Sequence, residues 1–433
     1  MANKHVNLDA LFADIADAIR EKTGEADSII ADDFPDVIRE RLQVIPPIPY
    51  LTFSSPNSFT LKVNDATKHW DGTLEYSTDT SSWTTWGGTT TLSSATSGSD
   101  NVLYLRGTGN TVITGKKSNY RWTLTGSDIS CIGNIETLLD YATVESGHHP
   151  TMADQCYRLM FYGCTSLTQA PALPATTLAS YCYMQMFYGC SSLTKAPALP
   201  ATTLASYCYY HMFEDCTSLV QAPKLPATTM VNSCYEGMFW YCTALIQAPA
   251  LPATIMGDSC YREMFRGCSS LTKAPALPAT TLASYCCYCM FDGCTALTQA
   301  PTLPATTMVD SCYNQMFNGC TSLTQAPALP ATTLAPSCYT AMFQNCTSLT
   351  QVPALSTTTL AKYCYQMMFR GCTKIKLSST QTGEYTVAYR IPMSGTSTNI
   401  DALLNMFGKT GGTFTGTPEI NTTYYLSNTN TVV

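Results

Sequence analysis

Hydrophobic positions recur at a fixed spacing through the middle of the chain. The pattern Cys-Tyr-x-x-Met-Phe-x-x-Cys, written CYMQMFYGC at 182–190, occurs nine times between residues 156 and 372, with Cys287 in place of Tyr in one copy, and every step is 26 residues. A fixed period in the twenties is typical of a solenoid, in which each turn buries its apolar face against its neighbours. We therefore expect eight units over 164–371, preceded by a degenerate half-unit at 138–163.

The first half of each unit has an extended character. In LTQAPALPATT, residues 167–177, the prolines that recur at 171, 197 and 223 exclude a helix and remove donors from a strand ladder. The sequence predicts one very short strand per turn, or a polyproline-like segment. Leu167 and Leu173, with their copies, are expected to point into the core.

The second half of each unit has helical spacing. Cys182, Met186 and Cys190 stand at i, i+4 and i+8, and Tyr183 and Phe187 lie close to them on a helical wheel. The pattern predicts a helix of about two turns whose repeated residues face the core. Because packed helices need more room than stacked strands, the solenoid is expected to curve with its helices on the convex side.

Three columns of the repeat vary much more than the others. The positions of 184, 185 and 188 each hold seven residue types in eight copies, whereas the column of Gln169 holds only Gln and Lys. One interpretation is a diversified binding face, since Tyr, Trp and Arg are typical interface anchors. The other is a solvated face under no constraint. On the first interpretation the candidate binding residues are Met184, Gln185, Tyr188, Tyr210, His211, Glu214, Glu236, Trp240, Arg262, Glu263, Arg266, Tyr288, Asp292, Asn314, Gln315, Asn318, Thr340, Gln344, Gln366, Met367 and Arg370.

The segments that flank the repeats differ from them and from each other. Apolar stripes predict two short amphipathic helices over 7–23 and 31–42, within an attachment segment 1–45. Short β-type runs broken by Gly, Ser, Asn and Asp predict a small β-sandwich domain at 46–130. The solenoid then occupies 131–372. Residues 373–433 keep one Met-Phe pair and are expected to form a C-terminal cap.

Charge and hydropathy exclude several classes of partner. Charged residues make up only 12% of the chain and the net charge is −7, so we expect no nucleic-acid partner. No uncharged apolar run is long enough to span a membrane, so we expect no membrane insertion. The first residues, MANKHVNLDALFADIADAIREK, lack the apolar core of a secretory signal. If this is the natural start, the protein is expected to stay in the cytosol, or to leave it by lysis or an unconventional route.

Cysteine is abundant, but its placement indicates packing rather than chemistry. Of the 21 cysteines, 18 occupy two columns of the repeat, and we expect them to be reduced and buried. The cluster of Cys286, Cys287 and Cys289 permits a soft-metal site, yet ordinary variation is favoured because Cys286 belongs to a core column. No catalytic constellation stands out, so we expect no enzyme, no cofactor and no metal.

The unit CTSLTQAPALP…LASYCYMQMF is similar to the BspA-type leucine-rich repeat, although Ala-Pro replaces the apolar strand positions and the unit is longer. The segments LEYSTDTSSWTTW and GNIETLL look like the β-domain and lead-in that often precede such repeats in gut-bacterial and gut-phage surface proteins. The leader LFADIADAIREKTGEADSIIADDFPDVI resembles that of tail-associated proteins from phages and prophages of gut Firmicutes. Together with the patterns described above, the resemblance predicts a mixed α and β chain with short N-terminal helices, a small β-sandwich and a curved leucine-rich-repeat-like solenoid.

The same resemblance implies a function in host recognition. The expected protein is a virion component, a phage tail fibre or receptor-binding protein. Residues 1–45 would contact other tail proteins, and the solenoid would bind a bacterial surface receptor, a glycan or a protein. Such fibres are often trimers, which leaves a homotrimer open. Two alternatives remain: a bacterial cell-surface adhesin of the BspA type, and a structural spacer whose variable columns bind nothing.

Overall fold

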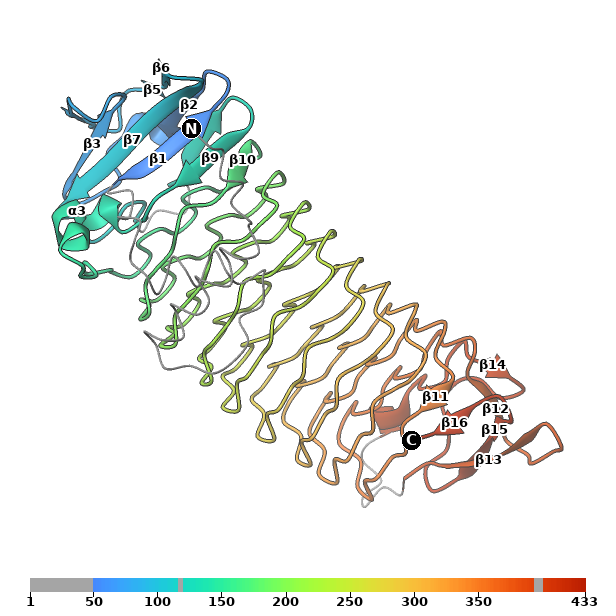
Figure 1. Ribbon diagram of the computed structural model, residues 1–433. Coiled ribbons are helices and arrows are strands. Elements are labelled where there is room, and N and C mark those ends of the chain that lie inside the picture. Colours follow the sequence, from blue (N-terminus) through green and yellow to red (C-terminus); the bar gives the residue numbers. More distant parts are fainter. Residues whose placement is uncertain (1–49, 116–119, 393–399) are drawn as a thin grey trace, which may run out of the picture. The chain divides into compact units, whose positions relative to one another are not determined.

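The computed structural model describes residues 50–433, apart from 116–119 and 393–399 (Figure 1). The helices expected over 7–23 and 31–42 lie outside the described residues. The described part is mostly β-structure and turns. It contains one α-helix, α3 (Thr137–Glu145), so the expected mixed α and β character is not found there.

Two sheets make up the first domain. The larger has the order β10-β9-β1-β7-β3-β4, with β6 also paired to β7, and the smaller has the order β5-β2-β8. A short 3₁₀ helix, η2 (Asn64–Ala66), follows β2. The strands are β1 (Leu51–Ser55), β2 (Thr60–Val63), β3 (Thr73–Ser77), β4 (Thr84–Thr85), β5 (Leu92–Ser93), β6 (Ala95–Ser97), β7 (Asp100–Thr108), β8 (Trp122–Thr125), β9 (Ile129–Ile132) and β10 (Leu167–Gln169).

This first domain closes one end of the repeat stack. Strand β10 belongs to the first full unit and pairs in parallel with β9. The ring of Phe161 lies 6.2 Å from Phe53 of β1 and 6.2 Å from Trp122 of β8, so the first turn packs against both sheets. The Trp122 N–H also donates to the Met160 carbonyl at 2.8 Å. The aromatic core of the domain therefore continues into the solenoid.

The second half of each unit is not a helix. Tyr181, Gln185 and Gly189 have φ of 58°, 52° and 67°, and the same three positions of each later unit also have positive φ. An α-helix needs negative φ at every residue. The segment is instead a ribbon of overlapping four-residue turns, in which alternate turns carry positive φ at their third residue, as type II turns do. The predicted helix and its wheel are therefore wrong.

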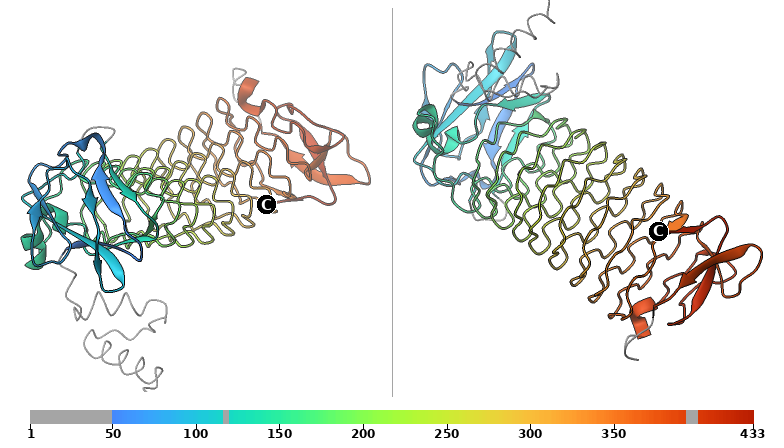
Figure 2. Two further views of the ribbon diagram at one scale, coloured as in Figure 1. Left: turned by 90° about the horizontal axis from the view of Figure 1, so that it is seen from above. Right: turned by 60° about the horizontal axis from the view of Figure 1, so that its bottom comes forward.

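Backbone N–H groups of this ribbon alternate between two kinds of partner. The Met186 N–H donates to Tyr183 O in the same turn at 3.1 Å, whereas the next N–H, of Phe187, donates to Met212 O in the following turn at 3.0 Å. The alternation recurs along the stack, so every second donor ties one turn to the next. The ribbon thereby forms a hydrogen-bonded ladder without regular strands (Figures 1 and 2).

Aromatic rings of the repeated columns stack along the whole solenoid. Successive Phe rings from Phe161 to Phe369 lie 5.5–5.8 Å apart between centroids, and most are within 10° of parallel. This step is closer to the spacing of paired strands than to that of packed helices. The expected cause of curvature, a row of wide helices on one side, is therefore absent.

The extended half of each unit carries the isolated parallel bridges. Leu167 and Leu173 are buried, as predicted. Lys195 pairs with Gln221, and Gln221 pairs with Gln247, through single bridges that recur farther along the stack. The Gln/Lys column that varies so little is thus a bridging position of this half, as is the column of Thr177, and it forms the short strand β11 (Gln351–Val352) in the last unit.

The cysteine that ends the Cys-Tyr-x-x-Met-Phe-x-x-Cys pattern has a specific hydrogen-bonding role. Its thiol donates to the Phe carbonyl of the preceding turn, from Cys190 to Phe161 at 3.2 Å through Cys372 to Phe343 at 2.9 Å. All 21 cysteines are buried free thiols. Burial raises the pKa of Cys164 to about 11 and that of Cys234 to about 12. A small apolar side chain with one weak donor suits this position.

We expect the cysteines to resist alkylation in the folded protein. Iodoacetamide in mildly alkaline buffer should label almost none of them, because only the thiolate reacts and burial disfavours it. In denaturant without reductant, mass spectrometry should find all 21 labelled. Incomplete labelling in denaturant would reveal disulfides and contradict the reduced core.

The C-terminal segment closes the other end of the stack. Phe407 stacks on Phe369 at 5.5 Å, and the Phe369 N–H donates to Met406 O at 2.9 Å, so Met406 and Phe407 continue the repeated columns. A sheet of order β13-β15-β12-β14 lies beyond them, and β16 pairs in parallel with β11. The elements are β12 (Lys376–Ser378), β13 (Tyr385–Arg390), the 3₁₀ helix η3 (Ile400–Leu403), β14 (Gly411–Gly412), β15 (Thr423–Ser427) and β16 (Thr431–Val432).

One irregularity interrupts the column of stacked tyrosines. Cys287 stands where the other units have Tyr, and a small, mainly apolar pocket beside it is lined by Tyr261 and Tyr313 of the flanking turns. Replacing Cys287 with Tyr should fill this gap and stabilise the protein by about 0.5–2 kcal/mol. The matched substitution Cys289→Tyr, at a buried site two residues away, should destabilise it by overpacking. Urea unfolding midpoints would test both, and a lower midpoint for Cys287→Tyr would contradict the expectation.

Candidate binding face

The three variable columns lie on the ribbon and are less exposed than a solvated helix face would be. Members of the columns of Met184 and Tyr188 are mostly half-buried. The column of Gln185 is mostly buried, since His211 is 5% and Glu263 7% exposed. Side chains of neighbouring turns cover one another because the turns are so closely spaced. The ribbon therefore brings the candidate residues together as one continuous band.

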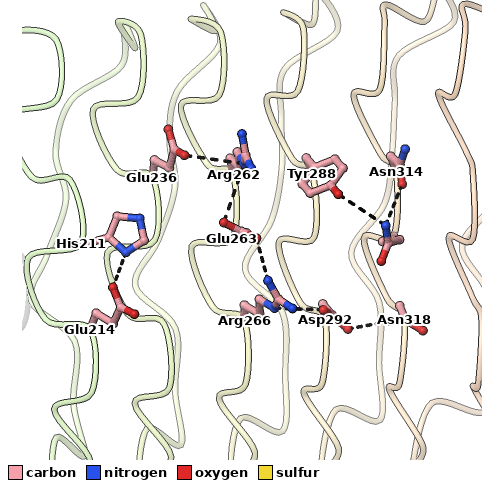
Figure 3. Close-up of polar contacts among 11 residues, drawn as sticks. His211, Glu214, Glu236, Arg262, Glu263, Arg266, Tyr288, Asp292, Asn314 and Asn318 are labelled. Atoms are coloured by element: carbon pink, nitrogen blue, oxygen red, sulfur yellow. Dashed lines mark hydrogen bonds and ion pairs between the residues drawn. The ribbon is translucent and has the colours of Figure 1, made fainter.

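Charged members of this band form a network across several turns (Figure 3). Arg266 is at its centre: Nη1 lies 2.8 Å from Glu263 Oε1, and Nε lies 3.0 Å from Asp292 Oδ2 of the next turn. Asp292 accepts a hydrogen bond from Asn318 Nδ2 at 2.8 Å. Arg262 lies 3.6 Å from Glu236 and 3.7 Å from Glu263. The two arginines therefore bridge three consecutive turns.

Aromatic members lie against the same charges. The Arg266 guanidinium lies 4.8 Å from the Trp240 ring centroid, and that of Arg262 lies 5.1 Å from the Tyr288 ring. His211 contacts Trp240 at 5.4 Å between centroids and pairs with Glu214. Cation–π contacts of this kind hold both the ring and the guanidinium in place. The central part of the band is thus a preorganised mixture of aromatic and charged groups.

The two ends of the band have different chemistry. At the N-terminal end Tyr188 stacks on Tyr162 at 4.5 Å, with Arg121 of the β-domain 5.5 Å from the Tyr162 ring, and Met184 and Gln185 beside them. The C-terminal end is neutral apart from its last member. It comprises Asn314, Gln315, Thr340, Gln344, Gln366, Met367 and Arg370. A ligand lying along the band would meet aromatic, charged and amide groups in turn.

Burial also changes the ionisation of the acidic members. Desolvation raises the pKa of Glu236 above its ordinary value of 4.5, although Ser233 and Arg262 oppose the shift. Desolvation likewise raises the pKa of Asp292, although Arg266 lies beside it. Burial raises the pKa of Tyr210 to about 12. The carboxylates are held in the band despite a cost of ionisation.

The Glu236 shift predicts a particular pH dependence. Because its pKa is raised in the folded protein, the contribution of this carboxyl to stability is fully present below its ordinary pKa and is lost as pH rises through the folded pKa. As pH rises from acidic to neutral, the original chain should lose this contribution and Glu236→Gln should not, so the stability of the variant relative to the original chain should increase. Urea midpoints across that range would test this, with exposed Glu384→Gln as the control. A stability difference that does not change with pH would contradict it.

One exposed aromatic residue was missed by the comparison of columns. Tyr241 is 45% exposed, and its column otherwise holds Gly, Asp and Asn. These are the residues that best tolerate the left-handed conformation, and Gly189 and Gly267 have φ of 67° and 70°. The recurrent glycine therefore indicated positive φ at this position. The tyrosine that replaces it in one unit, where a side chain is disfavoured, indicated a position with a further role.

The described residues offer no sign of metal chemistry. Within 50–433, outside the two gaps, no group of three or more His, Cys, Asp or Glu side chains is arranged to hold a metal ion. None of the helices in the described part is long and apolar enough to cross a membrane.

The repeat region matches a known family. Residues 158–272 and 258–376 match the BspA type leucine rich repeat region, in six copies, and together they span just over half of the chain. The chain belongs to the BspA-type leucine-rich-repeat family. Repeats of this family are typically surface adhesion and recognition modules and are generally non-enzymatic. Comparisons with curated proteins and with solved structures gave no match.

The family match identifies the stacked units as BspA-type leucine-rich repeats. In this chain, however, the ribbon of turns carries most of the inter-turn hydrogen bonds, and the strand of each unit is reduced to single bridges or two to three residues. The proline at the positions of Pro171 and Pro223 accounts for this, since it cannot donate to a ladder. The variable band therefore lies on the more regularly bonded side of each turn.

Proposed function

We propose that this BspA-type protein is a non-enzymatic phage tail fibre or receptor-binding protein, and that the variable band recognises a receptor on the bacterial surface. The observation that carries the proposal is the position of the three variable columns. They lie on one continuous ribbon, whereas the columns that hardly vary form the core or the bridging position. Drift alone would not confine variation to one band.

The composition of the band supports recognition. It presents Trp240, Tyr288 and two arginines in fixed positions, and such residues contribute disproportionately to binding energy at interfaces. Preorganised side chains lose little entropy on binding. In this proposal the protein acts in the virion, residues 1–45 attach it to other tail proteins, and the receptor is a glycan or a protein.

The family match favours a second candidate. BspA-type repeats are typically adhesion modules, so the same band on a bacterial cell surface would bind a host protein or another cell. Both candidates place recognition in the band. They differ in where the protein resides, which electron microscopy of virions and of cells labelled with an antibody to this chain would distinguish.

The proposal is tested by binding of the fluorescently labelled full chain to a panel of intact gut bacteria. A band variant would carry serine at half-buried Tyr188, Trp240, Tyr288 and Gln344, which removes aromatic anchors along the band and leaves the salt bridges of the network in place. A control variant would carry serine at exposed Lys195, Gln221, Gln247 and Gln299 in the bridging column.

We expect the original chain to bind some strains and not others. The band variant should bind those strains at least about tenfold more weakly, as expected for the loss of interface anchors, while the control variant binds normally. Circular dichroism would check that both variants fold. Binding that survives in the band variant would move recognition to the β-domain or the cap. Absence of binding to every strain would favour a structural spacer.

A further inference from the structure

The most exposed aromatic ring of the solenoid lies beside the backbone of the next turn. A methyl group placed at Gly267 would lie 2.3 Å from Tyr241 Cδ1 and 2.6 Å from Cε1, so the tyrosine ring covers the glycine directly. The Tyr241 N–H donates to Arg266 O at 2.8 Å, which fixes the register. Since 45% of the residue is exposed, much of the ring remains open to solvent.

The surroundings of Tyr241 combine an apolar ring with polar side chains. The Trp240 ring lies 5.8 Å away between centroids, and Arg266, which contacts Trp240, is held by Glu263 and Asp292. These charges are paired with each other, so the site has no strong field of either sign. An uncharged ligand with many hydroxyl groups fits such a site better than an ion does.

The next turns present backbone without side chains beside the ring. Gly293 and Gly319 follow Gly267 in the same column, and a methyl group at each would lie 3.7 Å and 3.6 Å from the preceding glycine Cα. Arg266, Asp292 and Asn318 immediately precede these glycines and border them with polar groups (Figure 3). The step between turns, 5.6 Å between Phe265 and Phe291, is comparable to the length of one sugar residue.

We infer that Tyr241 is a stacking platform for a pyranose ring of a neutral bacterial glycan, which then runs over Gly267 and Gly293 beside Asp292 and Asn318. The C–H groups on one face of a pyranose are slightly positive and pack on the negative face of an aromatic ring. The sugar hydroxyls donate to the Asp292 carboxylate and accept from the partly exposed Arg266 guanidinium. This inference rests on the proposed function and specifies its ligand as a glycan rather than a protein.

The test compares four full-length proteins: the original chain, Tyr241→Ala, Tyr241→Phe and Tyr285→Ala. Tyr285 is also exposed, at 38%, and serves as the matched control in another turn. Each would be applied to a printed panel of neutral oligosaccharides of hexoses and N-acetylhexosamines. Each would also be applied to bacteria that the original chain binds, untreated, oxidised with periodate, or digested with protease.

We expect binding to survive protease and to be lost after periodate, which destroys sugar diols. Tyr241→Ala should weaken binding by about tenfold or more, while Tyr241→Phe and Tyr285→Ala stay within about twofold. A panel without a match does not alter the conclusion if cell binding shows this pattern, since the pattern itself identifies a glycan.

Three results would overturn the inference. If Tyr241→Ala leaves cell binding intact, Tyr241 is not a stacking platform, although the proposed function still stands. Cell binding that protease abolishes and periodate spares would identify a protein receptor. Binding to neither cells nor panel would overturn the proposed function itself, together with this inference.

Discussion

Replacing Phe265 with Ala should destabilise the protein by about 3–5 kcal/mol, the range measured for large aromatic residues removed from packed cores. The side chain is fully buried, and it stacks between Phe239 at 5.7 Å and Phe291 at 5.6 Å. Its loss leaves a cavity and separates the two halves of a continuous column. Because each turn is stabilised only by its neighbours, a central gap should also reduce cooperativity.

Urea unfolding followed by circular dichroism measures both effects. Phe265→Ala should lower the midpoint strongly and broaden the transition or split it in two. The exposed residue Ile255, at 59% exposure, gives a matched control that also truncates a large apolar side chain. Its alanine variant should stay within about 0.5 kcal/mol. Equal midpoints for the two variants would mean that the aromatic column does not hold the stack together.

Removing residues 373–433 should convert the protein from a discrete species into aggregates. The last turn would lose Phe407, which covers Phe369, and β16, which pairs with β11. Buried rings and unpaired N–H groups of the final turn would then be open to another chain. Open solenoid ends and exposed strand edges associate readily, which is why terminal caps are needed for solubility.

Size-exclusion chromatography with light scattering would test this. The truncated chain should elute mainly as large assemblies, and its midpoint should fall. Phe407→Ser, which removes one ring and keeps β16 in place, should give an intermediate result. A truncated chain that remains as soluble and as stable as the original would show that the segment is not a cap.

Much of the burial could be predicted from the repeat alone. Leu167, Leu173, Cys182, Met186 and Phe187 are all buried, as their periodic recurrence indicated. A period in the twenties specifies which side chains of successive units meet, since only identical positions stack in a solenoid. The repeat family follows from the same residues.

The local conformation could not be predicted by the helical wheel. Cys182, Met186 and Cys190 are spaced by four, which fits a helix, but a ribbon with positive φ at every fourth residue has the same spacing. Over nine residues the two patterns do not differ. Only the recurring glycine next to the second cysteine separates them, because glycine is disfavoured inside a helix and favoured at positive φ.

The candidate residues occupy three columns of one ribbon, but their burial was misjudged. His211, Glu236 and Glu263 lie largely between turns because the ribbon places them closer together than helices would. Tyr241 was overlooked because the other residues of its column, Gly, Asp and Asn, are explained by the positive φ of that position. Whether the band binds a receptor stays a prediction.

The most direct measurement is hydroxyl-radical footprinting of the full chain, free and bound to cell envelopes of a strain that it recognises. The account predicts protection of Tyr188, Trp240, Tyr241 and Tyr288 on binding, with no change at Tyr50 or Tyr104 in the β-domain. Protection confined to the β-domain, the C-terminal segment or the bridging column would contradict it, because recognition would then not use the variable band.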